Sequence, residues 1–429
     1  MWQLRRSLVC RNESDASCMS GENAPRPLAG GLSLIAPLVA IYIVSQLLRN
    51  SLGVIAPDLV VELQLSATGI GLLSSTFFIG FALVQLPLGM AIDRFGPRLC
   101  LLVGAVITAL GAVAFALAER QAGLVVGRAL MGIGTAGSLM APLAIYSRRF
   151  SPQRFGKLTG VQLSLGTTGT LLATAPLGIL AANIGWRAGF LIIAAFICCV
   201  GMGIFFAIQD DTGWPHKRGE NLVQSLAGIA EILRTPAIWP LFAMNLVVYS
   251  SFGLVAALWG GPYLAHAYGF GLEHRGALLL IAVIGQILGS FLWGSMDRLT
   301  GSYKAPVASG ATLTALCLGM LAWRGILPST LLIAWFFVFG TVSAYSAPLL
   351  AHGKALFAPH QLGRGLTLLN MGTMGGAVLT QIISGAIIGT FPTLPDGSYE
   401  LSAYQLVFGL QALFILLCLL AYLPARDPH

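Results

Sequence analysis

The stretch Gly89-Met-Ala-Ile-Asp-Arg-Phe-Gly-Pro-Arg98 is a short charged segment between two long apolar stretches. A weaker copy, Trp293-Gly-Ser-Met-Asp-Arg-Leu-Thr-Gly301, lies between two further apolar stretches in the second half of the chain. Asp93-Arg94 and Asp297-Arg298 therefore mark equivalent positions of an internal repeat. Repeats of this kind are typical of membrane proteins built from two related halves.

The composition excludes a soluble globular protein. Hydrophobic residues make up 56% of the 429 residues and charged residues only 9%, whereas charged residues are about 25% of an ordinary soluble domain. The 52 glycines suit the close packing of helices in lipid.

Long apolar stretches predict membrane-spanning helices, because each crossing needs about 20 mostly apolar residues and lipid cannot satisfy the polar groups of an open backbone. The stretches lack the apolar and polar alternation of a barrel strand. We count twelve spans: 32–56, 68–91, 97–118, 121–145, 157–181, 187–208, 237–264, 275–295, 304–323, 328–350, 365–390 and 402–423. The predicted fold is all-α, with two pseudo-symmetric six-helix bundles around a central cavity.

Four segments make up the predicted organisation of the chain. Residues 1–28 are polar, lack the apolar core of a signal peptide, and are predicted to be a disordered tail. Residues 29–208 form the first bundle, 209–235 a linker that lets the bundles rock, and 236–429 the second bundle.

Basic residues predict the orientation in the membrane. Of the 24 Lys and Arg residues, 18 fall on the side of the two termini and two inside helices. The other four, Arg120, Arg187, Arg275 and Arg324, fall on the opposite side. The positive-inside rule then places both termini in the cytoplasm of a multi-pass protein of the bacterial inner (plasma) membrane. We do not expect nucleic-acid binding, because these residues are spread over short loops.

The twelve spans, the two halves and the repeated loop resemble the major facilitator superfamily. Its signature, Gly-x-x-x-Asp-Arg-x-Gly-x-Arg, is met by Gly89, Asp93, Arg94, Gly96 and Arg98. The resemblance implies that Asp93 and the neighbouring basic residues latch the cytoplasmic ends of helices from opposite halves, with Asp297 and Arg298 as the second copy. A carboxylate near a helix N-terminus and opposite Arg residues would form a breakable electrostatic clasp.

A narrower resemblance covers the first two spans. Arg49-Asn-Ser-Leu-Gly-Val-Ile-Ala-Pro-Asp58 and Gln85-Leu-Pro-Leu-Gly89 look like the organic-anion and anion:cation symporter branch of the superfamily. In that branch the first-span Arg binds the anionic group of the substrate, which implies this role for Arg49. Leu48 and Thr135 stand where the branch often has acids, so the chain departs from its pattern at both positions.

Two arginines lie inside predicted spans, Arg49 and Arg128. A charge within the membrane is costly and usually faces an aqueous cavity. Each lies about eight residues from the outer end of its span, so both should sit roughly 10–12 Å below the outer surface. All 16 acidic residues fall in the tail, loops or helix ends, which leaves the two arginines without an evident partner. We expect an anion to neutralise them, because the guanidinium fork binds carboxylate or phosphate.

An alternative is open for Arg128. Arg128 and Gly132 match an Arg-x-x-x-Gly feature of the resembled family, in which the arginine bonds backbone carbonyls. Further cavity candidates are polar or aromatic residues in other spans, each of which could instead join two helices. They are Asn50, Tyr249, Trp259, Tyr345, Asn370 and Gln381.

The favoured function is secondary transport of a small organic anion by alternating access, with a proton or another ion as a possible coupling partner. The alternative is efflux of drugs or siderophore-like compounds, for which Ala175-Pro176-Leu-Gly178 is a partial match to the Gly-Pro pair of family antiporters. A non-transporting sensor on the same scaffold would need a large soluble domain. We expect a monomer in the lipid bilayer, no enzyme activity, no cofactor and no metal, because neither a nucleophile–base pair nor a metal-type Cys/His spacing is present.

Overall fold

The computed structural model describes residues 29–208, 235–236, 238–356, 362–394 and 398–427. The predicted tail and all of the predicted linker but Thr235 lie outside these residues. Within them, every regular element is a helix, apart from one isolated β-bridge between Thr393 and Tyr399. Twelve helical segments are long and apolar enough to cross a membrane, which confirms the predicted count and fold class.

In the described part of the first half, residues 29–208, there are nine helices. They are α1 (Ala29–Asn50), α2 (Leu52–Leu63), α3 (Ala67–Phe95), α4 (Pro97–Ala116), α5 (Gln121–Thr135), α6 (Met140–Arg149), α7 (Pro152–Leu172), α8 (Ala175–Ile184) and α9 (Trp186–Ala207).

Among the described residues of the second half there are ten α-helices and one π-helix. They are α11 (Ile238–Val248), α12 (Ser250–Gly253), the π-helix η1 (Leu254–Trp259), α13 (Gly260–Tyr268), α14 (Leu272–Trp293), α15 (Met296–Thr300), α16 (Lys304–Arg324), α17 (Ser329–Val342), α18 (Ser346–Leu356), α19 (Leu362–Ile388) and α20 (Leu401–Tyr422).

Several spans predicted as single helices are interrupted. The first is divided at Ser51 into α1 and α2, and the fifth breaks at Thr174, just before Pro176, into α7 and α8. Proline cannot donate the backbone hydrogen bond that a continuous helix requires. The seventh span passes through the π-helix η1, a form that often marks functional sites in helices.

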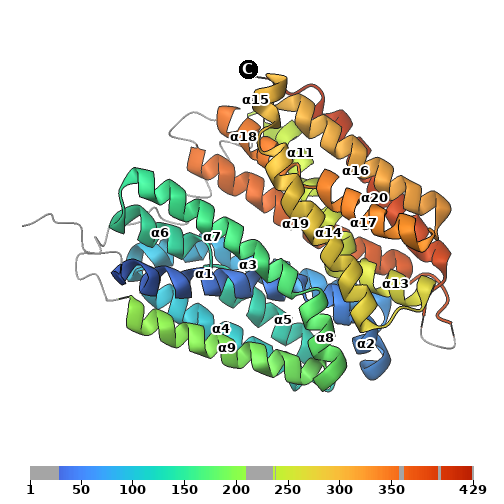
Figure 1. Ribbon diagram of the computed structural model, residues 1–429, viewed down its shortest axis with the longest axis horizontal. Coiled ribbons are helices and arrows are strands. Elements are labelled where there is room, and N and C mark those ends of the chain that lie inside the picture. Colours follow the sequence, from blue (N-terminus) through green and yellow to red (C-terminus); the bar gives the residue numbers. More distant parts are fainter. Residues whose placement is uncertain (1–28, 209–234, 237, 357–361, 395–397, 428–429) are drawn as a thin grey trace, which may run out of the picture.

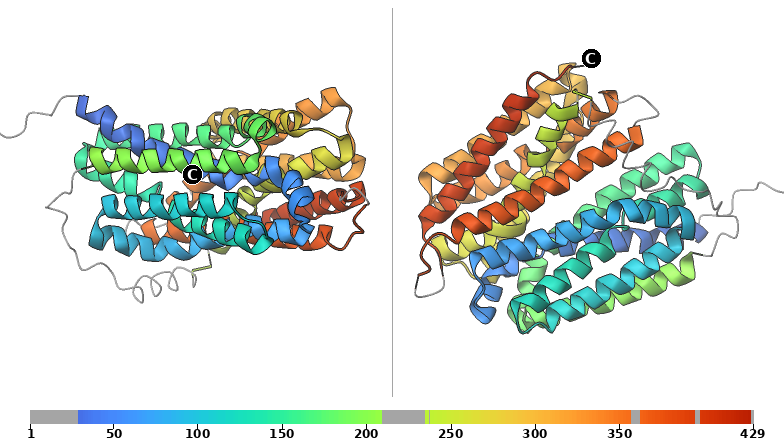
Figure 2. Two further views of the ribbon diagram at one scale, coloured as in Figure 1. Left: turned by 90° about the horizontal axis from the view of Figure 1, so that it is seen from below. Right: turned by 180° about the vertical axis from the view of Figure 1, so that it is seen from behind.

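The two bundles are in contact at one end of the molecule and splay apart toward the other (Figure 1). Helices α2, α8, α13 and the start of α14 form the contact end, which we call the outer end because it lies opposite the termini. At the other end of the molecule, the first bundle carries α6 and the second carries α15 and α18. These two ends diverge, as the view from behind also shows (Figure 2). The long helices α3 and α19 run side by side across the boundary between the bundles.

Glycines allow the backbones of the two bundles to touch at the outer end. A Cβ atom on Gly261 of α13 would lie 1.8 Å from the carbonyl oxygen of Gly53 in α2. A Cβ on Gly53 would in turn lie 2.1 Å from the carbonyl oxygen of Ala256. Any side chain at these positions would hold the bundles apart. The glycines therefore determine how closely the two bundles can approach each other at the outer end.

Candidate binding site

A pocket of about 190 Å³ lies between the two bundles. One wall comes from α1 and α7 of the first bundle, and the other from α12 and α14 of the second. Seven of its ten lining residues carry a polar side-chain group; the ten are Gln46, Asn50, Thr167, Thr170, Tyr249, Phe252, Val283, Gln286, Ile287 and Ser290. Both halves of the molecule therefore contribute residues to this pocket.

Arg49 lies beside this pocket, next to the ring of Tyr249. Its guanidinium carbon lies 4.8 Å from the ring centre of Phe81, 5.7 Å from Phe78 and 5.8 Å from Tyr249. Tyr249 also lines the pocket, whereas Arg49 itself does not. In the part of the chain that the structure describes, Arg49 makes no ion pair, and its buried Nε has no hydrogen-bond partner. Aromatic faces attract a cation without neutralising it, so Arg49 keeps the capacity to bind an anion.

Arg128 has a different environment, although it lies on the neighbouring helix α5. It is fully buried and donates from Nη1 to the carbonyl oxygen of Leu48 at 2.7 Å and from Nε to that of Leu73 at 3.2 Å. Its guanidinium carbon lies 4.9 Å from the ring centre of Phe77. These contacts tie α5 to α1 and α3 and match the structural role that the sequence left open for Arg128. Neither Arg49 nor Arg128 is among the residues that line the pocket, and the buried Nη2 of Arg128 has no hydrogen-bond partner among the described residues.

Among the other predicted residues, only Asn50 and Tyr249 line the pocket. Asn50 donates to the carbonyl of Gln46 at 2.8 Å and to Oγ1 of Thr170 at 3.4 Å. Trp259 is buried in the second bundle and donates to Ser384 at 2.8 Å. Tyr345 is fully buried, and its ring lies against Gly310.

Asn370 and Gln381 both face α3 of the other bundle. Asn370 donates to the amide oxygen of Gln85 at 3.2 Å. The carbonyl of the buried Gln381 lies against Gly71, where a Cβ would come within 2.5 Å of it. Both residues thus lie at the boundary between the bundles, but only Asn370 joins the two helices through its side chain, since the buried Oε1 of Gln381 has no hydrogen-bond partner among the described residues.

The predicted clasp residues lie at the splayed end of the molecule. Asp93 and Arg94 are exposed in the last turn of α3, at the C-terminal end of that helix and not at an N-terminus. Gly89 is exposed on the same helix, and Arg98 donates to the carbonyl of Phe205 at 3.0 Å within the same bundle. In the second copy, Asp297 accepts from the backbone N–H of Arg298 at 2.9 Å. The latch between halves stays a prediction, and any N-terminal helix dipole for Asp93 must come from another helix.

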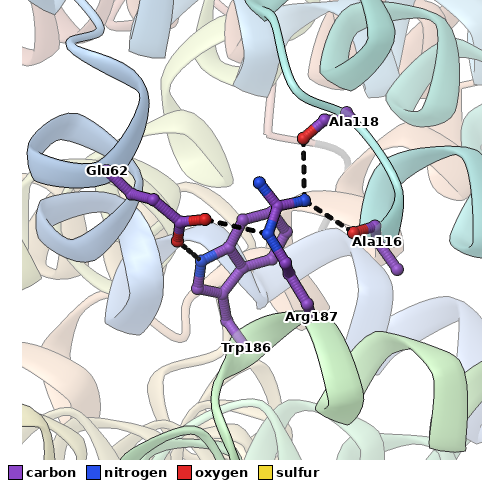
Figure 3. Close-up of polar contacts among 5 residues, drawn as sticks. All are labelled: Glu62, Ala116, Ala118, Trp186 and Arg187. Atoms are coloured by element: carbon purple, nitrogen blue, oxygen red, sulfur yellow. Dashed lines mark hydrogen bonds and ion pairs between the residues drawn. The ribbon is translucent and has the colours of Figure 1, made fainter.

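A network at the outer end of the first bundle joins three separate segments (Figure 3). Glu62 of α2 accepts from Nε1 of Trp186 at 2.6 Å and from Nε of Arg187 at 2.8 Å. Arg187 also donates to the carbonyls of Ala116 and Ala118, both at 2.7 Å, and stacks 4.4 Å from the ring centre of Trp186. Although burial favours a higher pKa for the Glu62 carboxyl, these hydrogen bonds hold its pKa below the usual value.

The pocket residues that sequence reasoning missed share one property: they are uncharged and unremarkable in isolation. Gln286 stands in an apolar span, and Gln46 precedes Asn50 by one helical turn on the same face. That spacing was the available signal for Gln46. Thr167, Thr170 and Ser290 carry no such signal, because their role depends on how the bundles dock.

Two six-helix bundles with a pocket between them define a membrane protein built from two related halves. The sequence matches the Major Facilitator Superfamily over residues 38–272 and 241–429. The chain belongs to this family, which confirms the resemblance seen in the sequence and the expectation that it is not an enzyme.

Several curated members of the family are similar in sequence. The chain is 28% identical over 258 residues to the hexuronate transporter of Bacillus subtilis, covering 58% of this chain and 59% of that protein. It is 25% identical over 298 residues to a probable sulfoacetate transporter of Cupriavidus necator, covering 65% of this chain and 68% of that protein. A putative tartrate transporter of Agrobacterium vitis is 23% identical over 413 residues, covering 90% and 93%.

Solved structures share the fold at low sequence identity. A point mutant of the nucleoside transporter NupG has a TM-score of 0.76 at 16% identity and covers 91% of this chain and 99% of its own. A bacterial homologue of the human lysosomal transporter Spinster, solved inward-facing and unoccupied, has a TM-score of 0.72 at 19% identity, covering 94% and 98%.

Proposed function

We propose that this protein is a secondary transporter that moves a small organic anion across the bacterial inner membrane by alternating access between its two bundles. The observation that carries the proposal is Arg49, a membrane-embedded cation held by aromatic rings beside a polar pocket. An unneutralised charge in this environment is unfavourable, and an anion entering the pocket relieves it.

The arrangement of the bundles supports alternating access. Contact at the outer end and separation at the end of the termini correspond to one end state of a rocking cycle (Figure 1). With the termini in the cytoplasm, as the basic residues predict, this state is open to the cytoplasm. Asp93, Arg94, Arg98, Asp297 and Arg298 lie at the end that must shut in the opposite state, where the proposed clasp would form.

The relatives support an anion. They are named for hexuronate, galactonate, tartrate and sulfoacetate, and each of these compounds carries an acid group. The seven polar residues of the pocket supply hydrogen-bonding groups for such a substrate. We keep a proton or another ion as the possible coupling partner.

The test is uptake of radiolabelled glucuronate, galactonate and tartrate into proteoliposomes, with neutral galactitol as the comparison. Arg49→Gln should weaken the affinity for the transported anion by about tenfold or more, because a hydrogen bond to a charged group is lost. Arg324→Gln is the matched control, since Arg324 is exposed at the end of α16. Unchanged anion affinity in Arg49→Gln would exclude the proposed role.

A further inference from the structure

We infer that Asp427, which follows the last helix, is a positioning residue for the proposed clasp at the splayed end. Its carboxylate fixes the turn 301–303 between α15 and α16, and this turn in turn holds Asp297 and Arg298. The inference rests on the proposed function for the alternating-access cycle in which the clasp forms. The contacts of Asp427 are features of the structure itself.

Three hydrogen bonds attach Asp427 to the start of α16. Its carboxylate accepts from the backbone N–H of Tyr303 at 3.1 Å, from that of Lys304 at 3.2 Å, and from the hydroxyl of Ser302. The N-terminus of a helix leaves such N–H groups unpaired and favours a nearby negative charge. Although burial favours a higher pKa for the Asp427 carboxyl, these hydrogen bonds hold its pKa below the usual value. Asp427 is therefore ionised at neutral pH.

A second set of contacts holds the chain that leads to Asp427. The carbonyl of Arg426 lies 2.7 Å from Nε2 of His352, and the hydroxyl of Tyr422 lies 2.6 Å from Nδ1. A carbonyl only accepts, so Nε2 donates to it and Nδ1 accepts from the tyrosine, as a neutral imidazole allows. The ring of His352 also stacks on that of Tyr303, with 5.9 Å between the ring centres. The C-terminal end of the chain is thus fixed beside α15 (Figure 1).

Ser302 connects this anchor to the clasp residues. Its hydroxyl donates to Asp427, its N–H donates to the carbonyl of Asp297 at 3.3 Å, and its carbonyl accepts from Thr300 at 3.1 Å. The side chain of Asp297 accepts from the backbone N–H of Arg298 at 2.9 Å. The carboxylate of Asp427 is therefore two hydrogen bonds away from the backbone of Asp297. Moving the first group displaces the second.

The first bundle joins the equivalent helix ends with the opposite chemistry. The offset that aligns the two Asp-Arg segments also aligns Arg98 with Ser302. Arg98 donates to the carbonyl of Phe205 near the end of α9, the helix along which α4 packs. In the second bundle α16 likewise packs along α20, but there a carboxylate from beyond α20 accepts from the turn. Asp427 thus has the place in the second bundle that Arg98 has in the first, with donor and acceptor exchanged.

The second Asp-Arg segment depends on such support more than the first. In the first half α3 continues unbroken to Phe95, and Pro97 begins α4. Proline restricts the backbone, so this turn is stiff. In the second half α14 ends at Trp293, the segment lies on the five-residue helix α15, and the sequence 294–303 contains no proline. A helix this short is not stable alone, so contacts from outside must fix it.

Spin labels test the inference on the purified full-length protein without any ligand. Gly156 of α7 and Ala355 of α18 are exposed at the splayed end in opposite bundles and can carry the labels. Without the carboxylate the clasp should form less readily. Asp427→Ala should therefore lower the population with short label distances at least about fivefold. Asp427→Glu keeps the carboxylate and should restore most of that population.

A control and an uptake measurement separate this role from simple stabilisation. Arg426→Gln removes a neighbouring charge, but the Arg426 side chain is exposed and only its carbonyl bonds His352, so this variant should behave like the wild type. In proteoliposomes Asp427→Ala should lower the maximal rate of uptake of radiolabelled glucuronate, galactonate or tartrate per folded protein, again by about fivefold or more. Asp427→Glu should recover most of this rate as well.

The outcomes are distinct. Wild-type label distances in Asp427→Ala would overturn the inference. A lower melting temperature with wild-type distances and rate would also overturn it, because Asp427 would then only stabilise α16. Neither result affects anion transport by the wild type. If the wild type takes up none of the labelled acids, the proposed function fails, and the label distances still decide whether Asp427 controls the splayed end.

Discussion

Nη2 of Arg275 lies 2.9 Å from Oδ2 of Asp58, and this ion pair joins the two bundles at the outer end. Asp58 belongs to α2 and Arg275 to the first turn of α14. The side chain of Arg275 is only 5% exposed and that of Asp58 is 35% exposed. In the proposed alternating-access cycle the outer end cannot open without separating the two groups, so the pair should contribute to the balance between the end states.

The pair should respond asymmetrically to loss of either partner. Arg275→Gln leaves an ionised, half-buried Asp58 without its counter-charge, which should shift the balance toward the outward-open state by about 1–2 kcal/mol, or roughly five- to thirtyfold. Asp58→Asn removes the charge that is costly to bury and should leave the closed end at least as populated as in the wild type. Spin labels at the exposed positions Gln64 and Trp323 would report the separation of the bundles. Opening in Asp58→Asn and none in Arg275→Gln would contradict this account.

Acid should favour the closed outer end. Burial raises the pKa of the Asp58 carboxyl above its usual value, and the neighbouring Arg275 offsets only part of the rise. In the open state Asp58 meets water and its pKa returns toward the usual value, so the closed state binds the proton more tightly. Protonation of Asp58 stabilises the closed outer end fully at pH values below the usual pKa. This stabilisation is lost as the pH rises through the raised pKa of the closed state. The same spin labels, measured across this pH range, should show the outer end closing as the pH falls in the wild type. This pH dependence should be absent in Asp58→Asn and should remain in Glu119→Gln, the control for an acid on the same side.

Close backbone contact should be as important as charge for closing the outer end. In Gly261→Ala the new methyl group would overlap the carbonyl of Gly53, at 1.8 Å in the present geometry. The bundles must then stay apart, and transport should fall at least tenfold while the protein remains folded. Gly375→Ala is a matched control in the second bundle, because nothing lies within 4 Å of a Cβ at that position. Wild-type transport by Gly261→Ala would show that the end states do not include this contact.

The sequence predicts the spans and the repeat because hydropathy and the Asp-Arg segments are local features of the chain. It does not predict the interruptions at Ser51 and in η1, which arise where α2 and α13 meet across the bundles. It finds Arg49 because a charge in an apolar span is conspicuous. It cannot separate Arg49 from Arg128, since the difference lies in whether backbone carbonyls of other helices are within reach.

Most pocket residues cannot be predicted from the sequence for a similar reason. Asn50 and Tyr249 were recognised as polar groups in spans, whereas Thr170 and Ser290 become pocket residues only because α7 and α14 lie on opposite sides of the same space. The ion pair between Asp58 and Arg275 was missed for the same reason, since its partners are distant in sequence and belong to different bundles.

Arg128 should behave as a structural residue, in contrast to Arg49. Arg128→Leu removes two hydrogen bonds from a charged donor to the carbonyls of Leu48 and Leu73, and such bonds contribute about 1.5–3 kcal/mol each. We expect a lower melting temperature in detergent, with the anion affinity of the remaining folded protein within a few-fold of the wild type. Arg49→Gln should instead lower the anion affinity and leave the melting temperature close to that of the wild type. A large loss of anion affinity in a stably folded Arg128 variant would contradict this prediction and show that Arg128 contributes to anion binding.

Arg187 should be the main support of the outer end of the first bundle. It joins α9 to the carboxylate of Glu62 in α2 and to the carbonyls of Ala116 and Ala118 after α4 (Figure 3). Arg187→Ala removes these bonds together and should destabilise the protein by about 2–4 kcal/mol, because two buried carbonyls lose their donor. Arg187→Lys keeps the charge but not the planar fork that serves three acceptors, so it should recover less than half of the loss. Thermal unfolding of the purified variants measures both effects, and full recovery by lysine would show that charge alone holds the network together.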